Sequence, residues 1–252
     1  MLRLFNYLFY IIIIFFFTYA FAQQTNWSNG IESQVRIISP STHINNQNEL
    51  YLGLQYKLKK GWKTYWLSPG EGGFPQNIDW TKSKNIQNIE VLWPTPNEFE
   101  ILGFKSLGYF DEVVFPLKTT IQNIEKETSV VLDVDYLTCK DICIPGSAHL
   151  ELLIPSGIGQ ITEHSFIIEK SLSLIPIDNL EISGLENVST KASADSDNVS
   201  IIITASSQKA FVDPKFYLNT EFGLPVITPK INYSANYKNL KANFIFEKKL
   251  FT

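Results

Sequence analysis

The sequence predicts an all-β protein built from antiparallel sheets. Apolar and polar residues alternate over several short segments, and turn-forming residues separate these segments. The alternation is clearest at 50–58, where every second residue is Leu or Tyr, a period that buries one face of a strand. Up to residue 155 no helix-type pattern falls between the strand segments. A β-sandwich is therefore favoured over a parallel α/β sheet.

The other strands expected in this region follow from shorter alternating segments. They lie at residues 33–39, 86–93, 113–117, 129–137 and 149–154. Between them stand residues that favour turns, at 60–61, 68–73, 94–96 and 145–146. The last of these, Pro145-Gly146, predicts a turn between the final two strands of the sandwich.

The pattern changes after residue 155. Ile161, Ile168 and Leu172 fall on roughly one helix face, and Pro176 ends the segment, which predicts a linker helix within 156–176. Alternation at 199–205, 215–220 and 242–246 then predicts a second β domain over 177–252, which we expect to be incomplete because the chain stops after an apolar strand. The polar stretch at 189–198 is expected to be a solvated loop.

The first 22 residues have the features of a secretory signal peptide. Arg3 precedes an apolar segment at 7–17, and Ala20-Phe21-Ala22 is the small-x-small pattern of a cleavage site. An uncleaved membrane anchor is the alternative, because residues 4–22 are almost long enough to span a bilayer. In both cases the rest of the chain is exported.

Composition excludes several functional classes. The formal net charge of −4 argues against a protein that binds nucleic acid through its phosphates, so no nucleic acid is expected as a partner. With 44% hydrophobic and 18% charged residues, the chain is expected to fold. The sequence also lacks the G-x-S-x-G, H-E-x-x-H, Walker and G-x-G-x-x-G motifs.

The cysteines, Cys139 and Cys143, form the one constellation with evident chemistry. Exported thiols tend to pair, and a three-residue spacer allows a disulfide if the Cα atoms come within about 4.4–6.8 Å. By loop closure alone this disulfide would stabilise the folded state by only about 2 kcal/mol, whereas one that closes a hundred-residue loop would contribute ~4.7 kcal/mol. A redox-active disulfide, an inert structural disulfide and a metal site that includes His149 all remain open, although a fourth metal ligand is missing.

An aromatic group supports a rival interpretation, a non-catalytic secreted binding module with a structural disulfide and an aromatic ligand platform. Stacking residues would have to be exposed and roughly coplanar, whereas packing in the core would bury them. The group consists of Trp62, Tyr65, Trp66, Trp80 and Trp93.

Four stretches together resemble the N-terminal periplasmic domain of the DsbD/ScsB-type protein-disulfide reductases, the thiol:disulfide interchange family. They occur in family order between residues 50 and 154. The stretches are Gly61-Trp62-Lys63-Thr64-Tyr65-Trp66 with Pro69-Gly70-Glu71-Gly72-Gly73, then Val91-Leu92-Trp93-Pro94-Thr95-Pro96, then residues 108–117, and residues 136–145.

The resemblance implies an immunoglobulin-like redox domain over 27–155. It implies that a thioredoxin-like periplasmic domain or membrane reductase donates electrons, and that a disulfide isomerase or another periplasmic thiol protein accepts them. Cys143 matches the cysteine that forms the mixed disulfide, and Cys139 the resolving cysteine. Glu98-Phe99 matches a cap that shields the pair. No metal or organic cofactor is implied, and the short spacer resembles the ScsB-like branch.

Overall fold

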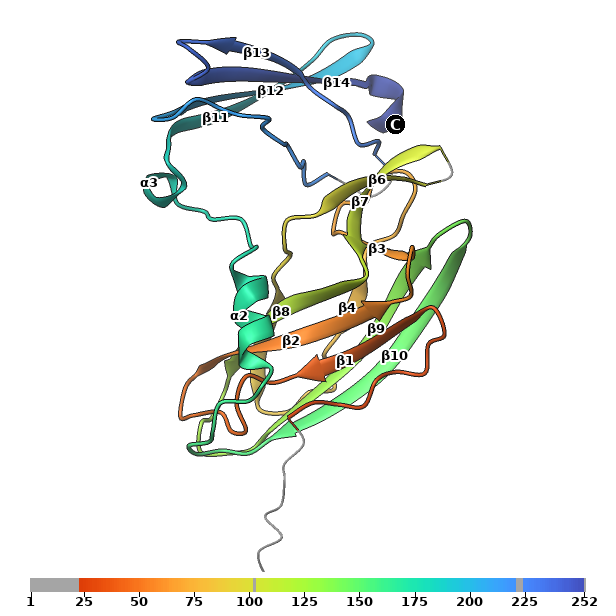
Figure 1. The fold of residues 1–252 in the computed structure, drawn as a ribbon, viewed down its shortest axis with the longest axis vertical. Coiled ribbons are helices and arrows are strands. Elements are labelled where there is room, and N and C mark those ends of the chain that lie inside the picture. Colours follow the sequence, from red (N-terminus) through yellow and green to blue (C-terminus); the bar gives the residue numbers. More distant parts are fainter. Residues whose placement is uncertain (1–22, 102, 221–223, 252) are drawn as a thin grey trace, which may run out of the picture.

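The computed structural model describes residues 23–101, 103–220 and 224–251, so the predicted signal peptide at 1–22 lies outside it. In Figure 1 the described strands form a larger β unit, followed by a helical connection and a second sheet. The second sheet lies at the end of the larger unit where β6 and β7 are found. None of the helices among the described residues has the length and apolar character to cross a bilayer.

The larger unit is a sandwich of antiparallel sheets. One sheet has the order β1-β2-β8-β5, and the other has the order β10-β9-β3-β7-β6, with β4 paired to β9. The strands of the first sheet are β1 (Ser33–Ile38), β2 (Glu49–Leu58), β5 (Ile86–Val91) and β8 (Glu112–Ile121). Those of the second sheet are β3 (Lys63–Tyr65), β4 (Asn77–Asp79), β6 (Asn97–Ile101), β7 (Phe104–Phe110), β9 (Thr128–Cys139) and β10 (Cys143–Ile154).

The core of the sandwich lies between these sheets and is rich in aromatic side chains. Phe115 is fully buried, and its ring meets Tyr56, Trp93 and Tyr109 edge-on at centroid distances of 5.0 to 5.4 Å. Edge-to-face packing adds to the burial energy of each ring. The all-β, sandwich-type fold predicted from the alternating pattern is therefore confirmed.

The predicted turn at Pro145-Gly146 is wrong, because both residues lie inside β10. Gly146 is opposite Tyr136 on β9, and a Cβ on Gly146 would come within 2.4 Å of the tyrosine ring. Position 146 therefore needs a glycine, because the Tyr136 ring crosses the backbone there. Pro145 is tolerated because β10 lies at the end of the sheet order, where a missing amide hydrogen costs no ladder bond.

The predicted linker helix is present but shorter than its pattern suggests. Helix α2 covers Ser165–Leu172 and buries Ile168 against Ile38 and Val114, and a single turn, α3 (Leu180–Ser183), follows. Ile161 does not share this face as predicted. It precedes the helix, forms a bridge with Ser41, and has an 80% exposed side chain.

The second unit is an antiparallel sheet with the order β11-β12-β14-β13. Its strands are β11 (Leu185–Ala194), β12 (Asn198–Ser207), β13 (Lys230–Ser234) and β14 (Asn239–Glu247), and a 3-10 turn, η1 (Lys248–Phe251), follows. Leu240, Ala242, Phe244 and Phe246 form its buried core. The apolar alternation predicted β12 and β14 at their observed positions.

Two expectations for this unit are wrong. The expected loop at 189–198 is mostly strand β11, which shows no alternation because nearly all of its side chains are exposed. The expected strand at 215–220 is irregular backbone. Its side chains alternate for another reason: Phe216 and Leu218 pack onto the apolar face of the sheet, and the Phe216 ring lies 5.9 Å from that of Phe244.

Candidate functional site: a capped disulfide

The cysteines form a disulfide at the tip of the β9–β10 hairpin. Cys139 and Cys143 are direct partners across the strands, with an S–S distance of 2.03 Å and a Cα–Cα distance of 4.1 Å. That Cα distance is slightly shorter than the range usual for disulfides. The amide of Lys140 donates to the carbonyl of Ile142 at 3.0 Å, which closes the three-residue loop between the cysteines. The spacer therefore serves as a hairpin turn that presents both sulfurs.

The two cysteines differ in exposure. Cys139 is completely buried, whereas Cys143 is only partly buried. Its neighbours are exposed apolar residues, with Ile142 62% and Ile144 37% accessible. An attacking thiolate thus has access to the Cys143 side of the bond, and the Cys139 sulfur lies behind it.

Phe99 lies in the apolar cluster of this site and comes from the β6–β7 hairpin, which turns at Gly103 with a φ of 86°. The Phe99 ring lies 5.9 Å from that of Tyr65 and 5.4 Å from that of Phe110. The ammonium of Lys63 lies 5.6 Å from the Phe99 centroid, within cation–π range. Phe99 belongs to one apolar cluster with both cysteines, so the structure brings this predicted cap residue to the disulfide.

Glu98, the other residue of the predicted cap, is not brought to the sulfurs. Neighbouring residues on a strand point to opposite faces, so Glu98 points away from the face that carries Phe99. Its side chain is exposed, and its charge acts on Tyr217 of the second unit. Of the predicted pair, only Phe99 therefore lies in the apolar cluster that contains the disulfide.

Tyr65 is a site residue that the sequence analysis placed in the aromatic group and in the first family-like stretch, but not at the disulfide. Its hydroxyl lies 4.0 Å from Cys143 Sγ and donates a hydrogen bond of 2.8 Å to the Gly72 carbonyl. Burial raises the pKa of Tyr65 to about 12, so the hydroxyl stays a donor at neutral pH. A sequence signal was available: Gly73 leaves room for this ring, since a Cβ there would lie 2.2 Å from it.

The aromatic group does not form a ligand platform. Trp62, Tyr65 and Trp66 are buried, while Trp80 and Trp93 are partly buried and pack against the sandwich core. Stacking on a flat ligand requires exposed faces, which these side chains do not present together. The group acts as core packing.

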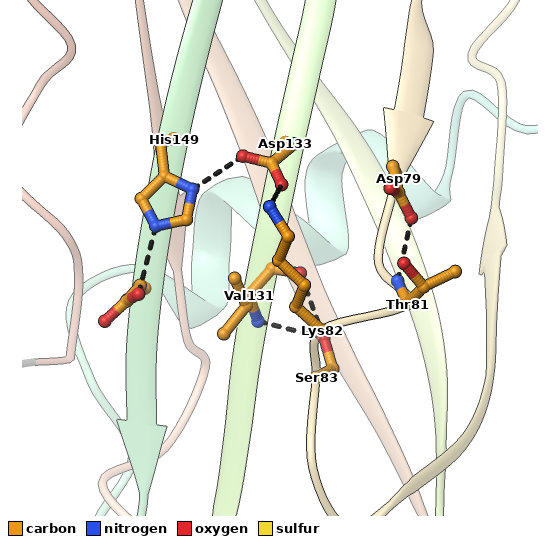
Figure 2. Close-up of polar contacts among 8 residues, drawn as sticks. Asp79, Thr81, Lys82, Ser83, Val131, Asp133 and His149 are labelled. Carbon is orange, nitrogen blue, oxygen red and sulfur yellow. Dashed lines mark hydrogen bonds and ion pairs between the residues drawn. The ribbon is translucent and has the colours of Figure 1, made fainter.

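His149 lies away from the disulfide in a polar cluster on the same hairpin (Figure 2). Its Nδ1 is 2.6 Å from Asp133 Oδ1 and its Nε2 is 3.0 Å from Glu151 Oε1, while Lys82 Nζ is 2.7 Å from Asp133 Oδ2. The carboxylates of Asp133 and Glu151 raise the pKa of His149. The structure does not bring His149 to the cysteines. Nor do the described residues contain a cluster of three or more His, Cys, Asp and Glu side chains suited to a metal.

Comparison with known proteins agrees with this geometry. A family profile described as thiol:disulfide interchange protein DsbD, N-terminal, matches residues 34–155. The crystal structure of the N-terminal periplasmic domain of ScsB from Proteus mirabilis matches with a TM-score of 0.68 and 21% sequence identity, over 90% of this chain and 86% of that chain. No curated protein sequence gives a significant match.

The profile match runs from β1 through the end of β10 and includes the disulfide, Tyr65 and Phe99. The structural match at low identity supports the fold of both β units. Residues 34–155 of this chain therefore form a DsbD-type N-terminal domain of the thiol:disulfide interchange family.

Proposed function

We propose that this protein carries out thiol–disulfide exchange in the periplasm, with Cys139 and Cys143 carrying the electron pair. The observation that carries the proposal is the asymmetry of the disulfide, with Cys143 accessible and Cys139 buried behind it. A disulfide that only stabilises the fold does not need an accessible sulfur. The short loop that this disulfide closes also gives it little value as a staple, about 2 kcal/mol.

In the proposed reaction the reduced domain donates two electrons to an oxidised client. The Cys143 thiolate attacks one sulfur of the client disulfide, forms a mixed disulfide and releases the other client sulfur as a thiolate. The Cys139 thiolate then attacks Cys143 Sγ. This step forms the Cys139–Cys143 disulfide and releases the second client sulfur, so the client ends as a dithiol.

The proposed electron donor is a thioredoxin-like periplasmic domain or a membrane reductase, and the proposed acceptor is a disulfide isomerase or another periplasmic thiol protein. Family membership and the periplasmic origin of the ScsB domain support this assignment and the periplasmic location. Exposed Ile142 and Ile144 give such partners an apolar contact beside Cys143. Phe99 would shield the pair until a partner displaces it.

The reduction potential of the Cys139–Cys143 pair tests the proposal. Purified protein is equilibrated in glutathione or dithiothreitol buffers, and free thiols are counted. We expect a value between about −180 and −270 mV, the range of exchange-active proteins. A value below about −300 mV would identify a stable structural disulfide and refute the proposed function.

Trapping tests the two cysteine roles separately. Cys139→Ala leaves Cys143 able to attack but removes the resolving thiol, so a mixed disulfide with a periplasmic client should accumulate on non-reducing gels. Cys143→Ala is the matched control and should trap little, because Cys139 is buried. The opposite pattern would reverse the assignment.

A further inference from the structure

We propose that the second β unit positions the cap of the redox site by clamping the loop that supports it. The clamp consists of residues 216–220 and 224–228 of the second unit, and the supporting loop is 68–73 of the sandwich. This inference rests on the proposed function. It assigns the second unit a role in controlling access to the Cys139–Cys143 disulfide.

The clamp holds the near end of the supporting loop by hydrogen bonds. Ser68 is 3% exposed, and its Oγ lies 2.8 Å from Asn219 Oδ1 and 2.9 Å from the Thr220 carbonyl oxygen. The same Oγ accepts a bond of 3.0 Å from the Thr220 amide. Two units separated by some 150 residues in sequence thus meet at one buried hydroxyl, which is costly to leave unpaired.

Apolar contacts strengthen this junction. The Tyr217 ring packs edge-on against Trp66 with a centroid distance of 6.3 Å. At Gly70, a Cβ would lie 2.7 Å from a methyl group of Val226, so the clamp sits directly on the loop backbone. The loop cannot move outward without displacing the second unit.

The clamp also contacts the cap hairpin. Lys105 on β7 donates from Nζ to Thr228 Oγ1 at 2.8 Å. Burial, and secondly the charge of Glu98 on β6, raises the pKa of Tyr217, which places that carboxylate close to the clamp tyrosine. Both strands of the hairpin therefore face the clamp, in agreement with the position of β6 and β7 beside the second unit in Figure 1.

The far end of the supporting loop reaches the redox site. The Gly72 carbonyl accepts the Tyr65 hydroxyl hydrogen bond, and Gly73 lies against the Tyr65 ring. A Cβ on Gly72 would lie 3.0 Å from Ile101 of the cap hairpin. The loop is thus wedged between Tyr65 and the hairpin that carries Phe99, which provides a continuous path of contacts from the clamp to the cap.

The clamp is itself anchored. Phe216 and Leu218 pack onto the sheet of the second unit, whereas Tyr217 and Asn219 contact the sandwich. Alternate side chains therefore bind the two units from one short extended segment. Because this segment is fixed on both faces, it holds the supporting loop in place relative to the second unit better than a free linker would.

The test compares a clamp variant with a matched control in the same unit. The clamp variant carries Tyr217→Ala and Asn219→Ala. The control carries Tyr233→Ala and Tyr237→Ala, an exposed ring pair near the end of β14 away from the clamp. The readout is the rate at which dithiothreitol reduces the disulfide in the full chain, measured in otherwise wild-type protein and again with Phe99→Ala.

We expect the clamp variant to be reduced severalfold faster than wild type, and the control to be reduced at the wild-type rate. In the Phe99→Ala background the clamp substitutions should add nothing, because their effect passes through the cap. Tyr217→Phe, which keeps the ring, should retain the wild-type rate. Ser68→Ala breaks the junction from the sandwich side and should also accelerate reduction, which provides a second test if the double variant folds poorly.

An unchanged reduction rate in folded clamp and Ser68→Ala variants would overturn the inference. So would an equal acceleration with and without Phe99, since a general loss of stability acts independently of the cap. The probe is a small thiol and requires no protein partner. A failed clamp is therefore distinguishable from a failed proposed function, which the reduction potential and the trapping experiment decide.

Discussion

The two halves of the β9–β10 hairpin carry opposite kinds of surface on the same pair of strands. At the tip, the Cys139–Cys143 disulfide lies in one cluster with aromatic and apolar side chains, among them Phe99 and Ile101 of the β6–β7 hairpin. Six residues further along β10, His149 joins Asp133 and Lys82 in an exposed network (Figure 2). The disulfide in its apolar cluster and the solvated charge cluster therefore lie at different positions along the same two strands.

The two regions differ in how strongly a side chain depends on its neighbours. Charges that face water are screened and contribute little to stability or to selectivity. At the tip, by contrast, Tyr65, Phe99 and Ile101 pack in one cluster with the cysteines, so a change in one of these side chains is expected to alter access to the sulfurs. We therefore expect substitutions near the tip to change stability or reactivity, and those in the charge cluster to change little.

The largest effect is expected from Gly146→Ala in the tip half. The added methyl group would overlap the Tyr136 ring at 2.4 Å, and that ring is held by Tyr56 at 5.2 Å. Overpacking of this kind costs about 1–3 kcal/mol in the free energy of unfolding, measurable by denaturant titration. The exposed neighbour gives the control: Ser147→Ala should stay within about 0.5 kcal/mol. Equal stability of the two variants would show that the ring yields readily.

Phe99→Ala should affect reactivity next most strongly. Removal of the ring uncovers Cys143, and alkylation of the reduced protein should accelerate about tenfold if the cap is open in roughly 10% of wild-type molecules. Timed reaction with iodoacetamide measures the rate. His149→Ala, in the charge cluster, should react at the wild-type rate, and an unchanged rate for Phe99→Ala would remove the ring from the account of shielding.

Tyr65→Phe should change the rate in the opposite direction. The variant keeps the ring but removes the hydroxyl that lies 4.0 Å from Cys143 Sγ. When Cys143 is a thiolate, we expect this hydroxyl to turn its hydrogen from the Gly72 carbonyl to the sulfur and to stabilise the charge. Alkylation at neutral pH should slow about threefold, which corresponds to a weak hydrogen bond of ~0.6 kcal/mol. If Tyr65→Phe instead reacted faster, the hydroxyl would act by holding the cap closed.

The smallest effect is a pH dependence of stability from the charge cluster. The carboxylates of Asp133 and Glu151 raise the pKa of His149, so the folded state binds its proton more tightly than the unfolded state does. The resulting stabilisation is complete below pH about 6.5 and disappears as the pH rises through the folded-state pKa. Thermal melts at pH 6 and pH 8 should therefore differ slightly more for wild type than for His149→Gln. If the stability of wild type exceeded that of His149→Gln by more at pH 8 than at pH 6, the predicted sign would be wrong.

Several elements could be predicted because burial on one face leaves a pattern in the sequence. Strand β14 buries every second side chain, and alternate residues of β12, from Val199 to Ala205, pack against the same cluster. Strands β3 and β4 have only three residues each, too few to show a period, and β11 buries almost nothing. The segment 216–220 shows the converse, since its alternation comes from two faces that pack against two different units.

The site was predictable in its chemistry but not in its asymmetry. The spacing of Cys139 and Cys143 and the family motifs indicated the pair, and the pairing is observed. Which sulfur is buried depends on the packing of Tyr65 and the cap hairpin, which brings together distant segments of the chain. The opposite orientations of Glu98 and Phe99 follow from strand geometry once β6 is known, but β6 has only five residues, too short an alternation to predict the strand.

Pro145 has a further consequence for how proteins approach the disulfide. The Cys139–Cys143 pair is closely spaced and flanked by a hydrogen-bonded pair at Lys140 and Ile142, so it is a non-hydrogen-bonded pair of the ladder. Pro145, two residues on, has the same type, and its nitrogen faces the open edge of the sheet. The edge thus lacks an amide donor at Pro145, two residues from the disulfide, which discourages a passing strand from adding to it. In the proposed function, a client would meet the sulfurs there with less tendency to form an intermolecular sheet that outlasts the exchange.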